Sequence, residues 1–287
     1  RRTDVPALEP EPLSPPYTEL GTTVSVSTYQ SWDELAAWYA QLFRDQMELD
    51  DDSREAGRRA VAGATSEAEK IRRLYNYVVK NTRYVGIELG IHGWKPYKAS
   101  EVHRRRYGDC KDKATLLAAL LRDNGIEATI ALVRTFDHGG FPAGHASMWA
   151  FNHAITYVPS AELYLDGTAE YSGSGELPYM DQGAFVLIVW PDGRFRLDSP
   201  PEATAAENMN RSSYQAEITP EGDLLLEGEE KFFGARAASV RQEYEEPKTR
   251  KQELERALSM ISPGAEVLDQ DFSDLSDLEA SPSYRYK

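Results

Sequence analysis

The sequence of 287 residues contains a single cysteine, Cys110. One cysteine excludes an intrachain disulfide and any zinc site built from several cysteines. The histidines also lack the close spacing of a metal-binding helix of the H-E-x-x-H type. The sequence therefore implies no metal and no cofactor. The histidines that remain as candidate catalytic bases are His92, His103, His138, His145 and His153.

Positive charge is scarce as well. Lysine and arginine total 32 against 47 aspartate and glutamate residues, which gives a net charge of −15. A chain this acidic repels nucleic acid phosphates and anionic membrane surfaces, so we expect no nucleic acid partner. The strongest basic run, residues 104–106, is too short for an electrostatic footprint, and we interpret it as structural or substrate-facing.

Long apolar runs are absent. There is no stretch of 18 apolar residues and no signal-peptide pattern, so we expect no membrane insertion by this fragment. The chain starts at Arg1 and not at a methionine, and we interpret it as an excised piece of a longer protein. Its hydrophobic content of 41% is enough for a substantial core in one large or two smaller domains.

What the chain does have is a helical pattern directly after Cys110. Apolar residues recur on one face with helical spacing, and Asn124-Gly125 supplies a stop signal. The sequence therefore predicts a helix of about three turns that begins near the cysteine. The residues that form its apolar face are Ala114, Leu117, Leu120 and Leu121.

The start of this helix suits an activated thiol. Asp109 is a good N-cap residue, and Asp112 three residues later makes an acidic variant of the capping box. Cys110 is then the first helical residue, where the helix dipole favours the thiolate, and Gly108 permits the tight turn that presents it. This arrangement indicates a nucleophile. The alternative is a small buried cysteine with a structural role.

Two lysines flank the predicted site, just after the cysteine. Lys111 and Lys113 have the charge to favour a thiolate or an anionic substrate. Because they stand beside Asp109 and Asp112, we expect instead a solvent-exposed first turn with paired charges.

A nucleophilic cysteine needs a base and a group that orients the base. His153 alternates with large apolar residues in 149–158, which places a polar side chain on the core face of a predicted strand. A second strand-like run, 162–167, follows after three residues and favours an antiparallel hairpin. If Val158 pairs with Ala161, His153 faces Asp166, whose carboxylate can hold the imidazole in one tautomer. Pro159 makes a longer loop and a shifted register possible, and a structural histidine is the alternative.

This order of residues resembles the transglutaminase-like superfamily, part of the broader papain-like cysteine fold. Residues 106–117 (RYGDCKDKATLL) resemble its nucleophile helix, 151–155 (FNHAI) its histidine strand and 165–171 (LDGTAEY) its aspartate strand. Residues 83–96 (RYVGIELGIHGWKP) are similar to a bacterial branch in which β-rich domains of unknown function flank the core. The resemblance implies an α+β fold, with a transglutaminase-like or papain-like core whose helices pack on an antiparallel sheet.

The resemblance also implies an activity. It makes Cys110 the thiol nucleophile, His153 the general base and Asp166 its orienting carboxylate. The expected enzyme is a thiol hydrolase or acyltransferase (amidase, peptidase or transglutaminase-type) that acts on a protein or peptide carboxamide through a thioester. The Cys110 amide is the natural first oxyanion donor, and the Trp94 indole is a candidate second donor, although Trp94 also suits a packed loop anchor. For the parent protein the resemblance implies export to the periplasm.

Two further functions fit the sequence. The same fold also serves as a non-catalytic protein-binding or assembly module, but the presence of Cys110, His153 and Asp166 together favours catalysis. An exposed activated thiol suits redox sensing, yet the chain has no second cysteine to resolve the oxidised form.

The pattern divides the chain into three parts. Residues 1–30, proline-rich at their start, are expected to be a linker or the end of a missing N-terminal β domain. Residues 31–200 form the core, with capped scaffold helices after Ser31 and Ser66 and a closing hairpin turn at 191–193. Residues 201–287 form a β-rich C-terminal unit, expected to be truncated or only partly ordered, with a hairpin within 214–233 and a helix at 249–261.

Overall fold

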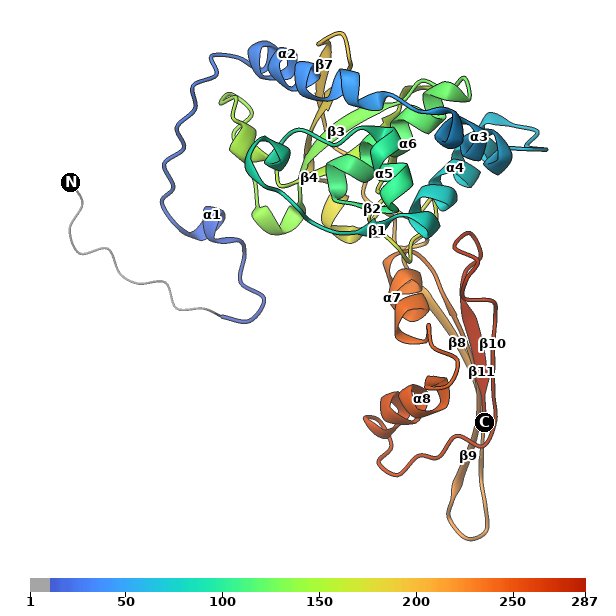
Figure 1. The fold of residues 1–287 in the computed structure, drawn as a ribbon. Helices are drawn as coiled ribbons and strands as arrows, with labels where there is room; N and C mark the ends of the chain where they lie inside the picture. Colours follow the sequence, from blue (N-terminus) through green and yellow to red (C-terminus); the bar gives the residue numbers. More distant parts are fainter. Residues whose placement is uncertain (1–10) are drawn as a thin grey trace. The chain divides into compact units, whose positions relative to one another are not determined.

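The computed structural model describes residues 11–287, so the first ten residues of the predicted linker lie outside the described part of the chain. The chain divides into two compact units (Figure 1). The first holds the described residues up to Thr168 together with Tyr179–Pro201, and the second holds Ala169–Pro178 together with Glu202–Lys287. The chain therefore leaves the first unit after Thr168 and returns to it at Tyr179.

The four longer helices of the first unit begin at side-chain caps. Ser31 accepts a hydrogen bond from the amide of Glu34, and Ser66 accepts one from the amide of Glu69, which confirms both predicted helix starts. Three helices, at Tyr17–Leu20, Asp51–Ala60 and Ala99–Arg105, have no counterpart in the sequence prediction. The helices are α1 (Tyr17–Leu20), α2 (Trp32–Phe43), α3 (Asp51–Ala60), α4 (Glu67–Asn81), α5 (Ala99–Arg105) and α6 (Cys110–Asp123).

A five-stranded antiparallel sheet forms the other layer of the first unit, in the order β5-β4-β3-β6-β7. Every residue of the central strand β3 is buried. The hairpin of β6 and β7 confirms the turn predicted at 191–193. The strands are β3 (Thr129–Arg134), β4 (His153–Val158), β5 (Leu163–Leu165), β6 (Phe185–Val189) and β7 (Phe195–Asp198).

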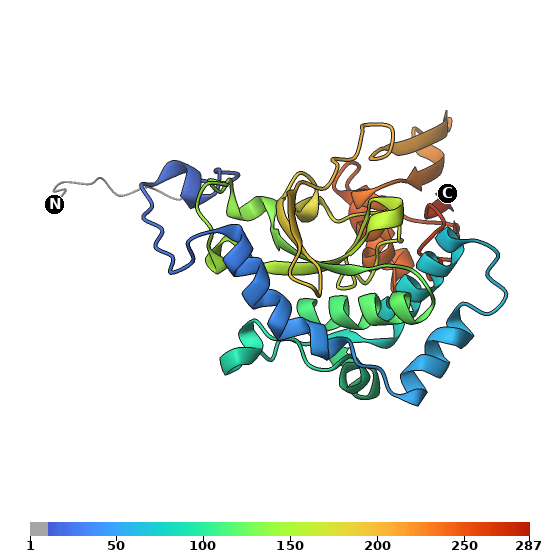
Figure 2. The same cartoon turned by 90° about the horizontal axis from the view of Figure 1, so that it is seen from above.

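Helix α6 is the centre of this unit. It lies against β3 and β4, with α3, α4 and α5 packed around it (Figure 2). All residues from Lys111 to Leu121 are buried, so the helix is covered on every side and not on the one face that its apolar spacing predicted. The arrangement confirms the predicted α+β fold with helices on an antiparallel sheet.

A short parallel pair positions the turn before α6. Strand β1 (Arg83–Tyr84) pairs with β2 (Tyr107–Gly108), and the amide of Val85 donates to the carbonyl of Gly108 at 2.9 Å. Gly108 is needed for a reason other than the predicted tight turn. It lies in the extended strand β2, and a Cβ atom there would come within 2.6 Å of Cβ of Asp112.

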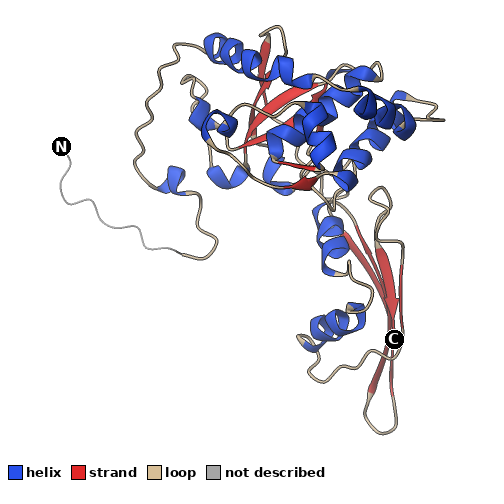
Figure 3. Ribbon diagram, viewed as in Figure 1, coloured by secondary structure: helices blue, strands red, loops and turns tan. Residues whose placement is uncertain are grey.

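The second unit is a four-stranded antiparallel sheet in the order β10-β11-β9-β8, accompanied by two helices (Figure 3). The hairpin predicted within 214–233 and the helix predicted at 249–261 are both present, and three residues of the acidic segment 269–277 form β10. The elements are β8 (Asn210–Ile218), β9 (Leu224–Phe232), α7 (Ala235–Glu243), α8 (Arg250–Ser259), β10 (Gln270–Phe272) and β11 (Ser283–Tyr286).

Arg241 of α7 organises the interior of this second unit. Its side chain is 1% exposed and pairs with Glu176 at 2.7 Å. It also donates to the backbone carbonyls of Tyr171, Leu278 and Ala280. Through these bonds Arg241 joins the segment Ala169–Pro178 to the C-terminal part of the same unit.

Across residues 11–287, no helix is both long enough and apolar enough to cross a bilayer.

Candidate active site

Cys110 is the first residue of α6 and is partly exposed. The predicted capping box is present: the Asp109 side chain accepts from the amide of Asp112 at 3.2 Å, and the Asp112 side chain accepts from the amide of Asp109 at 3.3 Å. A further bond, from the amide of Tyr97 to Asp112 at 2.8 Å, ties the cap to the preceding loop. The thiol therefore stands on a fixed helix start with access to solvent.

The prediction of a solvent-exposed first turn is wrong for both lysines. Lys111 is 5% exposed and donates to the Asp109 carboxylate, whereas Lys113 is fully buried and donates to the carbonyl of Thr82. The physical reason is that α6 is interior and has no face turned to water at this point. A buried ammonium group needs an acceptor, and each lysine has found one.

His153 opens strand β4, and the structure corrects the predicted hairpin register. Val158 pairs with Leu163 and not with Ala161. The residues Pro159–Ala161 form a single turn of 3-10 helix, and Glu162 follows in the left-handed region with φ of 47°. The loop is therefore longer than a two-residue turn, the outcome that Pro159 had left open.

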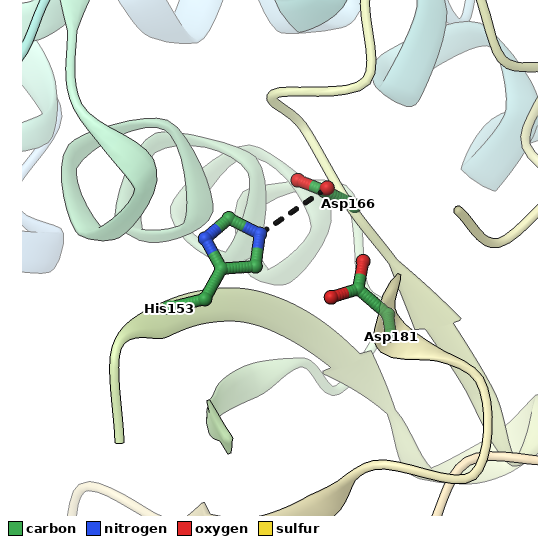
Figure 4. Close-up of side chains that lie close together, drawn as sticks. All are labelled: His153, Asp166 and Asp181. Carbon is green, nitrogen blue, oxygen red and sulfur yellow. Dashed lines mark ion pairs between the residues drawn. The ribbon is translucent and has the colours of Figure 1, made fainter. Parts of the chain in front are cut away.

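The register shift is two residues, so the side-chain faces are unchanged. Asp166 follows the end of β5 and lies diagonal to His153 on the same face. Nε2 of His153 is 3.2 Å from Oδ2 of Asp166 (Figure 4). The contact has the distance of an ion pair but not the angle of a linear hydrogen bond.

Both partners are deeply buried, with 12% of the His153 side chain and 3% of the Asp166 side chain exposed. Burial alone would lower the pKa of His153, but the charge of Asp166 and hydrogen bonding to Cys110 more than offset it and hold the pKa well above 6.5. Burial would raise the pKa of Asp166, and the charge of His153 together with bonds from Thr168 lowers it instead. The pair is therefore charged at neutral pH.

The two oxygens of Asp166 have separate partners. Oδ2 faces His153, while Oδ1 accepts from both the backbone amide of Thr168 at 2.8 Å and its hydroxyl at 2.7 Å. These bonds fix the orientation of the carboxylate. With Nε2 held by Asp166, the other imidazole nitrogen is left for Cys110.

A cleft of about 540 Å³ is lined by both Cys110 and His153. Its other walls are mostly apolar and aromatic. Trp94 and Trp149 meet there edge to face, with ring centroids 5.6 Å apart, and Trp149 is 80% exposed. Trp94, the candidate oxyanion donor, thus lies at the cleft that holds the thiol.

Other histidines have their own partners. Nε2 of His103 lies 2.8 Å from the Tyr77 hydroxyl, and Nδ1 of His92 lies 3.0 Å from the Lys95 carbonyl. His138 lines the cleft and contacts Asn152 at 3.2 Å. Of the candidate bases from the sequence, the structure brings His153 together with the thiol and a buried carboxylate.

Asp181, which the sequence analysis missed, joins this group. It ends the 3-10 turn Tyr179–Asp181 and is fully buried. One ligand-type atom from each of His153, Asp166 and Asp181 lies within 4.8 Å of the others (Figure 4). Such a nitrogen and oxygen set has the spacing to hold a metal ion, but a metal there would occupy the imidazole nitrogen that Asp166 orients. No local signal marks Asp181, because it follows a polar, turn-rich segment.

Comparison with known proteins agrees with the resemblance predicted from the sequence. Residues 54–161 match the model of the transglutaminase-like superfamily, a range that includes Cys110 and His153 and ends before Asp166. A search of curated proteins gives no match.

Two solved structures are similar to the chain. One is a proposed protease from Parabacteroides distasonis, with 13% identity and a TM-score of 0.46 over 71% of this chain and 50% of that one. The other is a proposed cysteine protease from Cytophaga hutchinsonii, with 16% identity and a TM-score of 0.32 over 44% of this chain and 42% of that one. The chain thus spans about half the length of the first.

Proposed function

We propose that the transglutaminase-like core, which the family match identifies at residues 54–161, is a thiol-dependent acyl-transfer enzyme that acts on a protein or peptide carboxamide. The observation that carries the proposal is the position of His153 between a thiol at a helix N-terminus and a buried carboxylate. This is the arrangement that generates a thiolate and stores its proton on an imidazole.

In the first half of the reaction, the thiolate of Cys110 attacks the carbonyl carbon of the carboxamide. The carbonyl oxygen becomes an oxyanion, and the backbone amide of Cys110 is free of the helix's internal bonding to stabilise it. The Trp94 indole is proposed as a second donor. His153 then gives its proton to the departing amine, the C–N bond breaks, and the acyl group stays on sulfur as a thioester.

The second half reverses these roles. Neutral His153 takes a proton from a water molecule or from an acceptor amine, whose oxygen or nitrogen attacks the thioester carbonyl. The C–S bond breaks, and the thiolate and the imidazolium are restored. Asp166 stays ionised throughout and holds the imidazole in orientation, with Thr168 fixing the carboxylate.

The cleft supports a substrate with an apolar or aromatic group beside the reacting carboxamide. Exposed Trp149 and half-buried Trp94 supply aromatic surface, which binds such groups through buried area and ring contacts. We propose a peptide segment of a protein as the ligand and, from the family resemblance alone, export to the periplasm in the parent protein.

The test is to look for the acyl-enzyme. The protein is incubated with a mixture of glutamine-containing peptides with and without a primary amine, and intact mass then shows any acyl adduct on the one thiol. Peptide products are followed for ammonia release, cleavage and amine incorporation. We expect an adduct that hydroxylamine removes, absent in Cys110→Ser, with turnover reduced by about 10²–10⁴ in His153→Ala.

Amine incorporation would identify transfer, and cleavage or ammonia release alone would identify hydrolysis. Peptide binding without adduct or turnover, unchanged in Cys110→Ser, would contradict the proposal and favour a binding module.

A further inference from the structure

Asp181 is the least explained group in the described part of the chain. Its side chain is fully buried, and neither carboxyl oxygen has a hydrogen-bond donor within reach. Its place is nevertheless well defined, because Tyr179 at the start of the same turn packs edge to face on Phe136, with ring centroids 5.4 Å apart. The position is therefore held by packing around the turn and not by any bond to the carboxyl group.

A buried carboxylate without a donor is costly, because it loses its hydration and receives nothing in return. A second carboxylate nearby adds repulsion, and Asp166 is that neighbour, within 4.8 Å. A proton on one of the two carboxyl groups removes both costs. The protonated group is neutral and donates a hydrogen bond, and the other group, which stays a carboxylate, accepts it. Asp166 is the member of the pair that stays ionised, because it has His153 and two bonds from Thr168.

We infer that Asp181 is a protonated positioning residue, whose carboxyl group donates a hydrogen bond to the Asp166 carboxylate and so helps to keep Oδ2 turned toward His153. The positioning role rests on the proposed function. The protonation does not, since it follows from burial and from the neighbours alone.

Most of the groups that face Asp181 raise the pKa of its carboxyl group. Burial and the negative charge of Asp166 raise the pKa of Asp181, and the positive charge of His153 lowers it. Hydrogen bonding to Asp166 and the charge of Asp137 raise it further. The result is a pKa of about 7. Asp137 belongs to the turn Phe136–His138, which packs against the turn that carries Asp181. The proton is therefore held through mildly acidic pH and lost near neutrality.

Loss of that proton has a consequence for the reaction. A second negative charge beside His153 stabilises the imidazolium and makes it a weaker acid for the departing amine. Deprotonation of Asp181 also removes its hydrogen bond to Asp166 and leaves two carboxylates that repel each other. We therefore expect turnover to fall as pH rises through about 7.

The first test is infrared difference spectroscopy of the wild type against Asp181→Asn. This comparison isolates Asp181 from Asp112, whose burial also raises its pKa. We expect the band of a protonated carboxyl group in the wild type below about pH 6 and its replacement by a carboxylate band above about pH 8. A carboxylate band at both pH values overturns the inference. Zn²⁺ binding at His153, Asp166 and Asp181 would also overturn it, and would be seen as a melting temperature that rises with added Zn²⁺ in the wild type but not in Asp181→Asn.

The second test separates positioning from packing. Asp181→Asn keeps a donor and cannot ionise, so we expect a rate within about twofold of wild type near pH 6 and no inflection near pH 7. Asp181→Leu fills the same space without a donor, and we expect about tenfold loss at each pH. Equal losses of melting temperature and rate in both variants, with the inflection retained, would leave only a packing role and refute the inference. If the infrared band is present but no variant or wild type shows turnover, the proposed function fails and the protonated pair stands.

Discussion

The ammonium group of Lys111 donates to the carboxylate of Asp109, so a buried ion pair joins the residues on either side of Cys110. The same carboxylate caps helix α6 through the amide of Asp112. One side chain thus fixes the helix start and neutralises the buried charge beside the thiol.

Removal of Asp109 should therefore be more costly than loss of an ordinary cap. Asp109→Ala removes the cap, worth about 1 kcal/mol, and leaves Lys111 buried without its carboxylate, so we expect a loss of about 3–5 kcal/mol in unfolding free energy. The measurement is chemical unfolding followed by tryptophan fluorescence, because all five tryptophans lie in the first unit. The control is Asp109→Ala combined with Lys111→Met, which should recover much of the loss. A loss below about 1 kcal/mol in the single variant would show that Lys111 finds water or another acceptor.

The two oxygens of Asp166 lead to a graded prediction for activity. Asp166→Asn removes the charge that faces His153 and places an amide beside Nε2, so we expect turnover to fall by about 10²–10⁴. Thr168→Val removes one of the two bonds to Oδ1 and leaves the backbone bond, so its loss should be about tenfold or less. Equal effects from both changes would mean that the orientation of the carboxylate matters as much as its charge.

The ion pair also predicts how stability depends on pH. The native pKa of His153 is raised, so its contribution is complete below about 6.5 and is lost as pH rises through the higher native value. The native pKa of Asp166 is lowered, so its contribution is present above about 3.8 and is lost as pH falls through the lower native value.

The stabilisation by this pair is therefore greatest between those limits. Melting temperatures of the wild type and of His153→Gln measure it, over a pH range that extends below the native pKa of Asp166 and above the native pKa of His153. The difference between the two proteins should narrow at both ends, and a constant difference would contradict the assignment.

In the second unit, Arg241 should be the most sensitive charged position. Arg241→Ala leaves Glu176 and three carbonyls without their donor in a buried site, and we expect a loss of about 3–5 kcal/mol in that unit. Hydrogen exchange of the amides in α7 and in Ala169–Pro178 measures it. Arg236→Ala is the matched control, since the Arg236 side chain on the same helix is 47% exposed and 3.6 Å from Glu243. Similar exchange in both variants would show that Arg241 contributes no more than a surface arginine.

Local signals in the sequence were sufficient for the helices that carry the site. The caps at Ser31, Ser66 and Asp109 act over three residues, so they are visible in the chain and are all present in the structure. The resemblance of residues 106–117 and 151–155 to a known family then predicted that Cys110 and His153 belong to one site, and the model of that family matches residues 54–161.

What the sequence did not contain is information that depends on distant contacts. The hairpin register was wrong by two residues because a 3-10 turn after Val158 replaced the assumed tight turn. Lys113 was assigned to solvent because its carbonyl partner, Thr82, is 31 residues away. Asp181 could not be found because it reaches the site only after the chain has passed through the second unit and returned.

The central claim is that Cys110 is activated by His153. The most direct measurement is the rate of alkylation by iodoacetamide as a function of pH, followed by intact mass, for the wild type, His153→Ala, Asp166→Ala and the control His103→Ala. The alkylation rate follows the fraction of thiol present as thiolate. For the thiol of a model peptide, that fraction rises at about pH 8.5. We predict that at neutral pH the wild type and His103→Ala are alkylated much faster than His153→Ala, because His153 takes the proton of the thiol. An ordinary inflection in the wild type, unchanged by His153→Ala and Asp166→Ala, would contradict the account and leave the flanking surfaces as the functional part of the chain.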